Sequence, residues 1–313
     1  MNSRWKLIGL ICCCVFCSPT LFAERVELAN GDVYDGDLVD GARTGSGVYT
    51  WSDGSTYEGE FLNNKLHGEG AFKWPDGRTY TGEFRDDRRH GQGRLEWPNQ
   101  DVYEGQFNQG RRTGIGTFTW QDGSQYSGLF NNGELQGDGS YTWPDGRRYT
   151  GPFHEGNKHG AGEFVWPNGN KYIGRFDNDV RAGSGVFYWR DGTVYRGQFS
   201  QDKMDGWGVK DLPDGRRELQ HWEQGSLQLN LLIEMAVNCA LVHDEKPFMF
   251  DHADCVNGLA HGEGVAVSLD GQTLIPYGRF VLGKLVDGSV LTLPAANAAN
   301  FEPGTSNLEI DDS

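Results

Sequence analysis

The chain has 313 residues, 46 of them glycine, and a formal net charge of −16 at pH 7; apolar residues make up 37% of it and aromatic residues 12%. The negative charge argues against binding of DNA, RNA or anionic membranes through the overall field of the protein. The aromatic content argues against a disordered chain, and abundant glycine without a collagen triplet points to internal repeats.

Residues 1–23 have the form of a secretory signal peptide. Two basic residues precede an apolar run over 7–16, and Ala23 offers a small residue before a cleavage site. The run is about half as long as a membrane-spanning helix requires, although an uncleaved anchor remains the alternative. We therefore predict cleavage after Ala23 and export to the periplasm or the extracellular space.

After a lead-in segment over 24–33, residues 34–217 repeat one pattern in eight units of 23 residues. Each unit begins with a tyrosine, which we take as offset zero. Glycine follows at +2, +11 and +13, phenylalanine at +4 in seven units, and tryptophan at +17 in seven units. An Asp or Asn stands at +19, usually before glycine at +20. In the second unit the repeat core is Tyr57, Gly59, Phe61, Gly68, Gly70 and Trp74.

This spacing predicts two strands and two turns in each unit. Residues at 0, +2 and +4 share one face of a strand, as do those from +11 to +17. The "PDG" and "QDG" segments suit tight reversals. Glycine stands where a side chain would collide with a neighbouring ring, so we interpret the rings as the core, each worth roughly 1.5–3 kcal/mol when buried. No unit can bury its rings alone, so stability depends on stacked neighbours.

The pattern Y-x-G-x-F, then G-x-G, then W-x-D-G resembles the MORN repeat (membrane occupation and recognition nexus) over 34–217. The resemblance implies an all-β protein, an elongated, twisted antiparallel β-meander of eight hairpin repeats. The family's roles are mostly scaffolding, self-association and attachment near membranes. Its pattern contains no catalytic residue, so the resemblance implies a non-enzymatic protein without a cofactor.

Residues 218–293 read as a divergent C-terminal capping region. Every second residue from Leu227 to Leu241 is apolar, which is a strand period, although a helix remains possible. The segment "HGEGVAVSLDG" over 261–271 restores offsets +10 to +20 of the repeat. The tail over 294–313 is small, polar and acidic, and we expect it to be disordered.

Four of the six cysteines lie within 1–23, which leaves Cys239 and Cys255 after cleavage. An even pair in an exported chain predicts a disulfide. Closing this loop would stabilise the fold by roughly 3 kcal/mol. In a reducing compartment the same pair, together with His243 and His252, has a spacing that suits zinc. Free thiols are the third alternative.

Basic residues occupy +8 or +9 of seven units and should emerge along one edge of the sheet. They are densest at Arg88, Arg89, Arg111 and Arg112. We predict a weak, salt-sensitive attraction to anionic surfaces, and the alternative is a solvated edge that blunts aggregation.

The opposite face of the last units is apolar. The residues of this possible patch are Ile173, Val186, Tyr188, Trp207 and Val209. A contiguous apolar patch at the end of an array indicates a cover. That cover is either the C-terminal region with its alternating row or a second copy of the protein in a dimer.

These observations favour a non-enzymatic interaction scaffold that binds an unidentified protein partner at the cell envelope. The alternative is a glycan- or lipid-binding module that uses the aromatic rows or the basic edge. Histidines at +10 recur two strands apart, about 10 Å, which is too far for two of them to share one zinc ion. We therefore predict no metal site. The repeat pattern leads us to expect no cofactor, and the negative net charge leads us to expect no nucleic-acid partner.

Overall fold

The computed structural model describes residues 22–233, 240–251, 254–257 and 259–295. Over these residues the chain forms 27 strands and no helix, so the described part contains no helical segment that could cross a membrane. Most of the predicted signal peptide, Cys239 and His252 lie outside the described residues. The chain divides into two compact units, the first over 1–98 with 108–110 and the second over 99–107 with 111–313. From here on, "unit" means one of these two, and each 23-residue unit of the sequence pattern is called a repeat.

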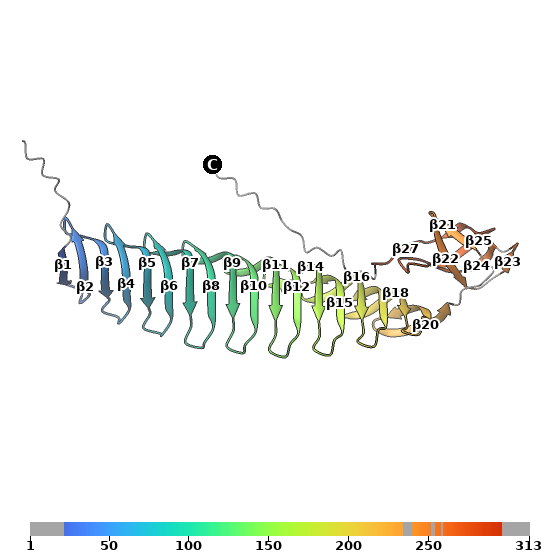
Figure 1. The fold of residues 1–313 in the computed structure, drawn as a ribbon, viewed down its shortest axis with the longest axis horizontal. Coiled ribbons are helices and arrows are strands. Elements are labelled where there is room, and N and C mark those ends of the chain that lie inside the picture. The colour runs from blue at the N-terminus through green and yellow to red at the C-terminus, as the bar shows by residue number, and fades with distance from the viewer. Residues whose placement is uncertain (1–21, 234–239, 252–253, 258, 296–313) are drawn as a thin grey trace, which may run out of the picture. The chain divides into compact units, whose positions relative to one another are not determined.

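In the first unit, each strand pairs antiparallel with the next along the chain. The strands are β1 (Phe22–Glu27), β2 (Val33–Val39), β3 (Ala42–Thr50), β4 (Thr56–Leu62), β5 (Lys65–Lys73), β6 (Thr79–Arg85) and β7 (Arg88–Glu96). β1 precedes the eight predicted repeats and overlaps the end of the predicted signal peptide. Figure 1 shows the successive hairpins of this unit in blue and teal.

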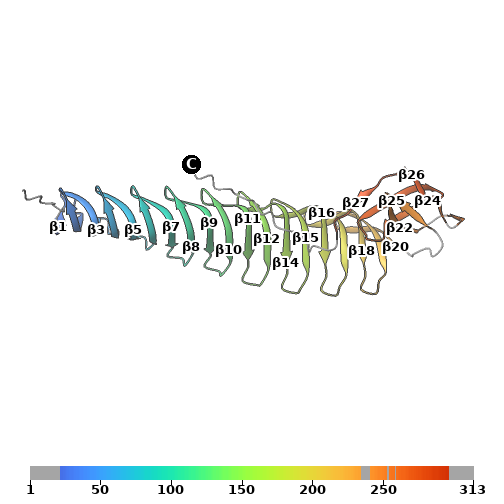
Figure 2. The same ribbon diagram turned by 45° about the horizontal axis from the view of Figure 1, so that its top comes forward.

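In the second unit the same meander continues from strand to strand (Figures 1 and 2). Its strands are β9 (Arg111–Thr119), β10 (Gln125–Asn131), β11 (Glu134–Thr142), β12 (Arg148–His154), β13 (Asn157–Lys158), β14 (Gly160–Val165), β15 (Lys171–Asp177), β16 (Val180–Tyr188), β17 (Val194–Ser200), β18 (Lys203–Asp211), β19 (Arg217–Glu223) and β20 (Ser226–Ile233). β8 (Val102–Asn108) lies at the boundary of the two units. The predicted antiparallel meander of hairpin repeats is confirmed.

The tight reversals begin at the residue at +17, which is tryptophan in seven repeats and Leu212 in the eighth. In the second repeat, the Trp74 N–H donates to the Arg78 carbonyl and the Gly77 N–H to the Trp74 carbonyl, both at 3.0 Å. Gly77 has φ +92°, a left-handed conformation that glycine adopts without a steric penalty. In the third repeat Gln100 holds the same position at φ +72°. The turn geometry therefore persists where the glycine does not.

The tyrosine rings form the core of the array. Tyr57 is fully buried and lies edge-on to Phe61 and Phe84, with ring centroids 5.1 and 5.0 Å apart. Its hydroxyl donates to the Glu60 carbonyl at 2.9 Å. A Cβ added to Gly70 would lie 2.4 Å from the Tyr57 ring. The ring thus occupies the space that a side chain at Gly70 would need.

The C-terminal region forms a second, seven-stranded sheet. Its strands are β21 (Leu241–His243), β22 (Lys246–Asp251), β23 (Asp254–Val256), β24 (Leu259–Ser268), β25 (Thr273–Val281), β26 (Lys284–Gly288) and β27 (Leu291–Thr292). The start of the alternating row does not belong to it. That part of the row lies in β20, which pairs with β19 and extends the first sheet. Leu227 of β20 remains 45% exposed.

Apolar residues of both sheets form one core cluster in the second unit. Val209 and Leu219 lie on the repeat sheet, and Val265, Val267 and Leu274 lie on the second sheet. All five are buried, and Val209, Leu219, Val267 and Leu274 are completely inaccessible. The second sheet therefore packs on the repeat sheet through β24 and β25 and supplies the cover for its last strands.

Candidate functional site

The tryptophans at +17 stay half-buried and stack on the aromatic residues at +15. In the first unit the ring centroids of Tyr49 and Trp51 are 4.5 Å apart, those of Trp51 and Phe72 are 5.1 Å apart, and those of Phe72 and Trp74 are 4.4 Å apart. In the second unit the same stack runs from Phe118 to Trp189 with spacings of 4.4–5.4 Å. Each unit therefore carries a ladder of rings on one face of its sheet.

Beside each ladder lies a cleft built from the same repeat offsets. The cleft of the first unit, which we call the first bay, has a volume of about 540 Å³. Its walls are Arg43, Tyr49, Trp51, Asp53, Ser55, Phe61, Asn64, Leu66, Phe72, Trp74 and Asp87. The second bay, of about 510 Å³, is in the second unit. It is lined by Trp166, Asn168, Asn170, Arg181, Phe187, Trp189, Phe199, Asp202, Lys203, Met204, Trp222 and Gly225.

The cations at +9 lie over the rings and not at the edge. The Arg43 guanidinium is 4.6 Å from the Tyr49 ring centroid, and that of Arg112 is 5.0 Å from Phe118. Arg89 lies 5.7 Å from the Trp74 ring centroid. Such cation–π contacts are worth about 0.5–1 kcal/mol at accessible sites. Of the basic residues at +9, Arg43 lines the first bay and Arg181 lines the second.

The four arginines predicted at one edge divide into two pairs. Arg89 and Arg112 are half-buried, and each donates at 2.8 Å to a backbone carbonyl of the next loop. Arg88 and Arg111 are exposed and contact Gln109 and Asn132, respectively, at 3.3 Å. Neighbouring residues of a strand point to opposite faces, so a pair at +8 and +9 cannot form one continuous basic edge.

The residues of the predicted apolar patch lie on the face opposite the ladder. Ile173 and Val186 are opposite each other on β15 and β16 and are 8% and 2% exposed. Val209 is in the core shared with the second sheet, and Trp207 packs against that core. Tyr188 is half-buried, with the Lys171 Nζ 5.0 Å from its ring centroid. All five therefore lie on one face of the sheet, on β15, β16 and β18.

Sequence reasoning missed a buried arginine in the middle of this face. Arg196 is 2% exposed and forms an ion pair with Asp211. Its Nε donates to the Gly271 carbonyl at 3.3 Å, across 75 residues of sequence. Arg217 binds Asp211 at 2.5 Å and donates to the Ser268 carbonyl at 3.1 Å. These bonds fasten the β24–β25 turn to the repeat sheet. The sequence signal that could have found it is a charged residue, Arg196, on the face that carries the predicted apolar patch.

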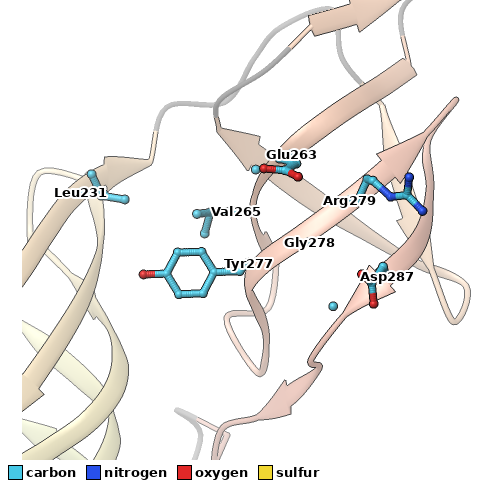
Figure 3. A pocket seen from close by; sticks show the side chains of 9 residues that line it. Leu231, Glu263, Val265, Tyr277, Gly278, Arg279 and Asp287 are labelled. Carbon is cyan, nitrogen blue, oxygen red and sulfur yellow. The ribbon is translucent and has the colours of Figure 1, made fainter.

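A separate cavity of about 470 Å³ lies between β20 and the second sheet (Figure 3). Leu231 lines one side, and Val265 and Tyr277 line the other. Glu263 and Arg279 stand on adjacent strands at its rim. The bays beside the ladder are lined by residues at matching repeat offsets in both compact units, so we take the ladder with its bays as the candidate site.

Metal and disulfide chemistry receive no support from the part of the chain that the structure describes. No group of three or more His, Cys, Asp or Glu side chains among those residues could hold a metal ion. Cys255 is in β23, but Cys239 lies outside the described residues, so the predicted disulfide stays a prediction.

A comparison with protein-family models identifies the repeat of the array. The MORN repeat model matches nine segments, at 34–56, 57–77, 80–102, 103–125, 126–147, 149–171, 172–194, 195–216 and 256–273. The chain belongs to the MORN-repeat family. Eight of these MORN segments coincide with the predicted repeats, and the ninth covers the segment over 261–271 that restores the repeat offsets. No curated protein matches the sequence.

Several solved structures are similar at low identity. The TCP domain of SAS-4 (dCPAP) from Drosophila melanogaster, solved in complex with a proline-rich motif of Ana2, shares 18% identity over 50% of this chain and 85% of that chain, with a TM-score of 0.34. The TCP10 domain of Danio rerio CPAP shares 16% identity over 66% and 99%, with a TM-score of 0.27. Superpositions this loose carry no conclusion about function.

Proposed function

We propose that this MORN-repeat protein is a non-catalytic scaffold that holds an extended segment of a partner protein along its aromatic ladder. The observation that carries the proposal is the recurrence of the bay. The same offsets, with two tryptophans, a phenylalanine or tyrosine at +15 and an arginine at +9, line a cleft in each unit. A recurring cleft suits a ligand that is itself extended and repetitive, whereas an enzyme concentrates its catalytic groups at one place.

The chemistry of the bays favours a polypeptide ligand. Half-buried tryptophans supply large apolar contact area, and tryptophan and arginine dominate the binding energy of many protein interfaces. The polar groups beside the rings, such as Asn64 and Asp87 in the first bay, can bind backbone amides of a peptide. The bays therefore combine an apolar floor with hydrogen-bonding rims.

A second candidate function is glycan binding. The second bay places Asn168, Asn170 and Asp202 beside Trp166 and Trp189. Flat aromatic rings next to amides and carboxylates also suit the apolar faces and hydroxyls of sugars. A shared groove surface would serve either ligand, so binding experiments must offer both.

We further propose that the protein acts in the cell envelope after export. The basis is the signal-like segment over 1–23 and the even cysteine pair that cleavage would leave. Cleavage after Ala23 would leave four residues of β1, Glu24–Glu27, in register with β2. The exposed Arg88 and Arg111 would add only weak attraction to an anionic surface, since contacts of this kind are screened over about 8 Å at physiological salt.

The test is selection of random 12-residue peptides on the purified full chain, with binding followed by tryptophan fluorescence. Peptides that bind should lose affinity at least ten-fold in Trp74→Ala or Trp166→Ala. Tyr277→Ala is the matched control, because Tyr277 is 67% exposed and lies outside the bays. If chito-oligosaccharides bind and no peptide does, the glycan function replaces this one. Peptide binding that survives both tryptophan substitutions would refute the groove.

A further inference from the structure

The spacing of the ladder selects among extended conformations of a bound peptide. One repeat advances by two strands, about 9.6 Å at 4.8 Å per strand. A polyproline II helix advances about 9.3 Å in three residues and then presents the same side again. A β-strand repeats its side-chain direction every two residues, about 6.7 Å, and so drifts out of register with the rings. A polyproline II chain thus offers one side chain to each repeat.

We propose that the first bay binds a basic, proline-rich segment in the polyproline II conformation. The proposal rests on the proposed function and specifies the partner of the same groove. Prolines pack well on flat aromatic rings, and aromatic-lined grooves recognise polyproline II chains in other domains. Trp51 and Trp74 of the first bay form two successive rungs for residues three apart in such a chain.

The polar groups of the ladder complement this backbone. A polyproline II chain makes no internal hydrogen bonds, so its carbonyl groups need donors from the groove. Among the described residues, none accepts a hydrogen bond from the indole N–H of Trp51 or Trp74, whereas Trp222 Nε1 donates to Gln220 Oε1 at 3.1 Å. The indole N–H groups are thus available to peptide carbonyls.

Charge decides which proline-rich segment fits. The first bay contains the exposed carboxylates of Asp53 and Asp87. Each uses one oxygen to accept a backbone N–H, from Ser55 and Leu66 respectively, which leaves the other oxygen for a ligand. The bay has one cation, Arg43, whose side chain is bound to the Asn64 carbonyl at 2.8 Å. Lysine or arginine beside the prolines would pair with the carboxylates, and the net charge of −16 attracts a basic peptide.

The second bay has the opposite balance. Arg181 is already paired with Asp202 at 3.1 Å, and Lys203 adds a second positive charge. A basic peptide therefore prefers the first bay. This difference lets a charge substitution in the first bay report on peptide binding while the second bay serves as an internal comparison.

The experiment measures fluorescence anisotropy of labelled peptides with the purified full chain. The probe is a peptide of twelve L-prolines followed by two lysines. The controls are its all-D enantiomer, the same peptide ending in two glutamates, and a glycine-serine peptide ending in two lysines. We expect the L-proline, lysine-ended peptide to bind at least ten-fold tighter than the D-enantiomer, because the mirror-image helix has the wrong hand. Shortening the run from twelve prolines to three should weaken binding, because three residues advance by only one rung of the first bay.

Charge variants of the protein test the assignment to the first bay. Asp53→Asn and Asp87→Asn keep the oxygen that caps the turn, so the fold should persist. Each should weaken the lysine-ended peptide about two- to five-fold, as for exposed ion pairs, with little effect on an uncharged proline peptide. Asp37→Asn is the control, because Asp37 lies on the other face and binds the Ser46 N–H at 2.9 Å.

The outcomes separate this inference from the proposed function. Equal binding of the two enantiomers, or tighter binding of the glutamate-ended peptide, overturns it. Selection of proline-free peptides that depend on Trp74 overturns it and leaves the scaffold function standing. Binding of chito-oligosaccharides without any peptide overturns both. The wild-type comparison of enantiomers needs no variant, so a substitution that disturbs folding does not decide the matter.

Discussion

Gly70→Ala should be among the most damaging small substitutions in the array. The added Cβ would lie 2.4 Å from Tyr57 ring atoms, whereas ordinary contacts are 3.4–4 Å. The ring cannot retreat freely, because it is fully buried and flanked edge-on by Phe61 and Phe84. Overpacking of this kind costs about 1–3 kcal/mol, and loss of the hydrogen bond from the tyrosine hydroxyl adds about 1 kcal/mol. We expect a loss of about 3 kcal/mol.

The assay is equilibrium urea unfolding of the full chain, followed by tryptophan fluorescence. The matched control is Gly54→Ala, where no atom lies within 4 Å of the added Cβ and only the φ of +91° is unfavourable. That strain costs about 1–2 kcal/mol. Combining Gly70→Ala with Tyr57→Leu should reduce the cost of the alanine, because the ring it meets has gone. Equal losses at Gly54 and Gly70 would refute the packing of rings on glycine.

Three further predictions follow from the structure and a fourth from the sequence. Gln100→Gly should raise the free energy of unfolding by about 1 kcal/mol in urea titrations, because a left-handed φ of +72° strains glutamine and not glycine. The array should unfold steeply above pH 10, which circular dichroism would detect. Burial raises the pKa of all eight repeat tyrosines, that of Tyr103 to about 12. The folded state therefore holds protons that the unfolded chain releases near pH 10, so stability is complete below that pH and lost above it. Asp211→Asn should cost about 3 kcal/mol and speed hydrogen exchange in β24 and β25, because it leaves the buried guanidinium of Arg196 uncompensated. Intact mass of the native protein should show a chain that starts at Glu24 and gains two thiols only on reduction.

The periodic part of the fold was predictable because each repeat has the same local chemistry. Strand faces, tight turns and buried tyrosines follow from offsets of two along a strand and from glycine at fixed places. The lead-in segment shares the tight turn of the repeats but has leucine where the repeats have tryptophan. Its Leu28 N–H donates to the Asp32 carbonyl at 2.8 Å, as the tryptophans at +17 do in their own turns. β1 therefore occupies the place of the second strand of a repeat.

The rest depended on contacts that no period encodes. Arg196 occupies a repeat position like any other, yet its partner Gly271 is 75 residues away. The contacts of Arg89 and Arg112 with aromatic rings can be identified only once the strand pairing is known. A repeat pattern fixes what neighbours share, whereas the second sheet and its anchoring arginines are particular to one end of the chain. Unique long-range contacts of this kind require the three-dimensional structure.

The two faces of the repeat sheet therefore differ in what determines their residues. The ladder face keeps its rings through both units, because every repeat uses them in the same way. The opposite face changes from the exposed Glu58 in the second repeat to the fully buried Val209 in the eighth, where the second sheet covers it. A polar substitution at Val209 should thus lower stability and leave peptide affinity unchanged, whereas Trp74→Ala on the ladder should lower affinity with a smaller loss of stability. Parallel changes in both quantities for both variants would mean that the faces are not independent.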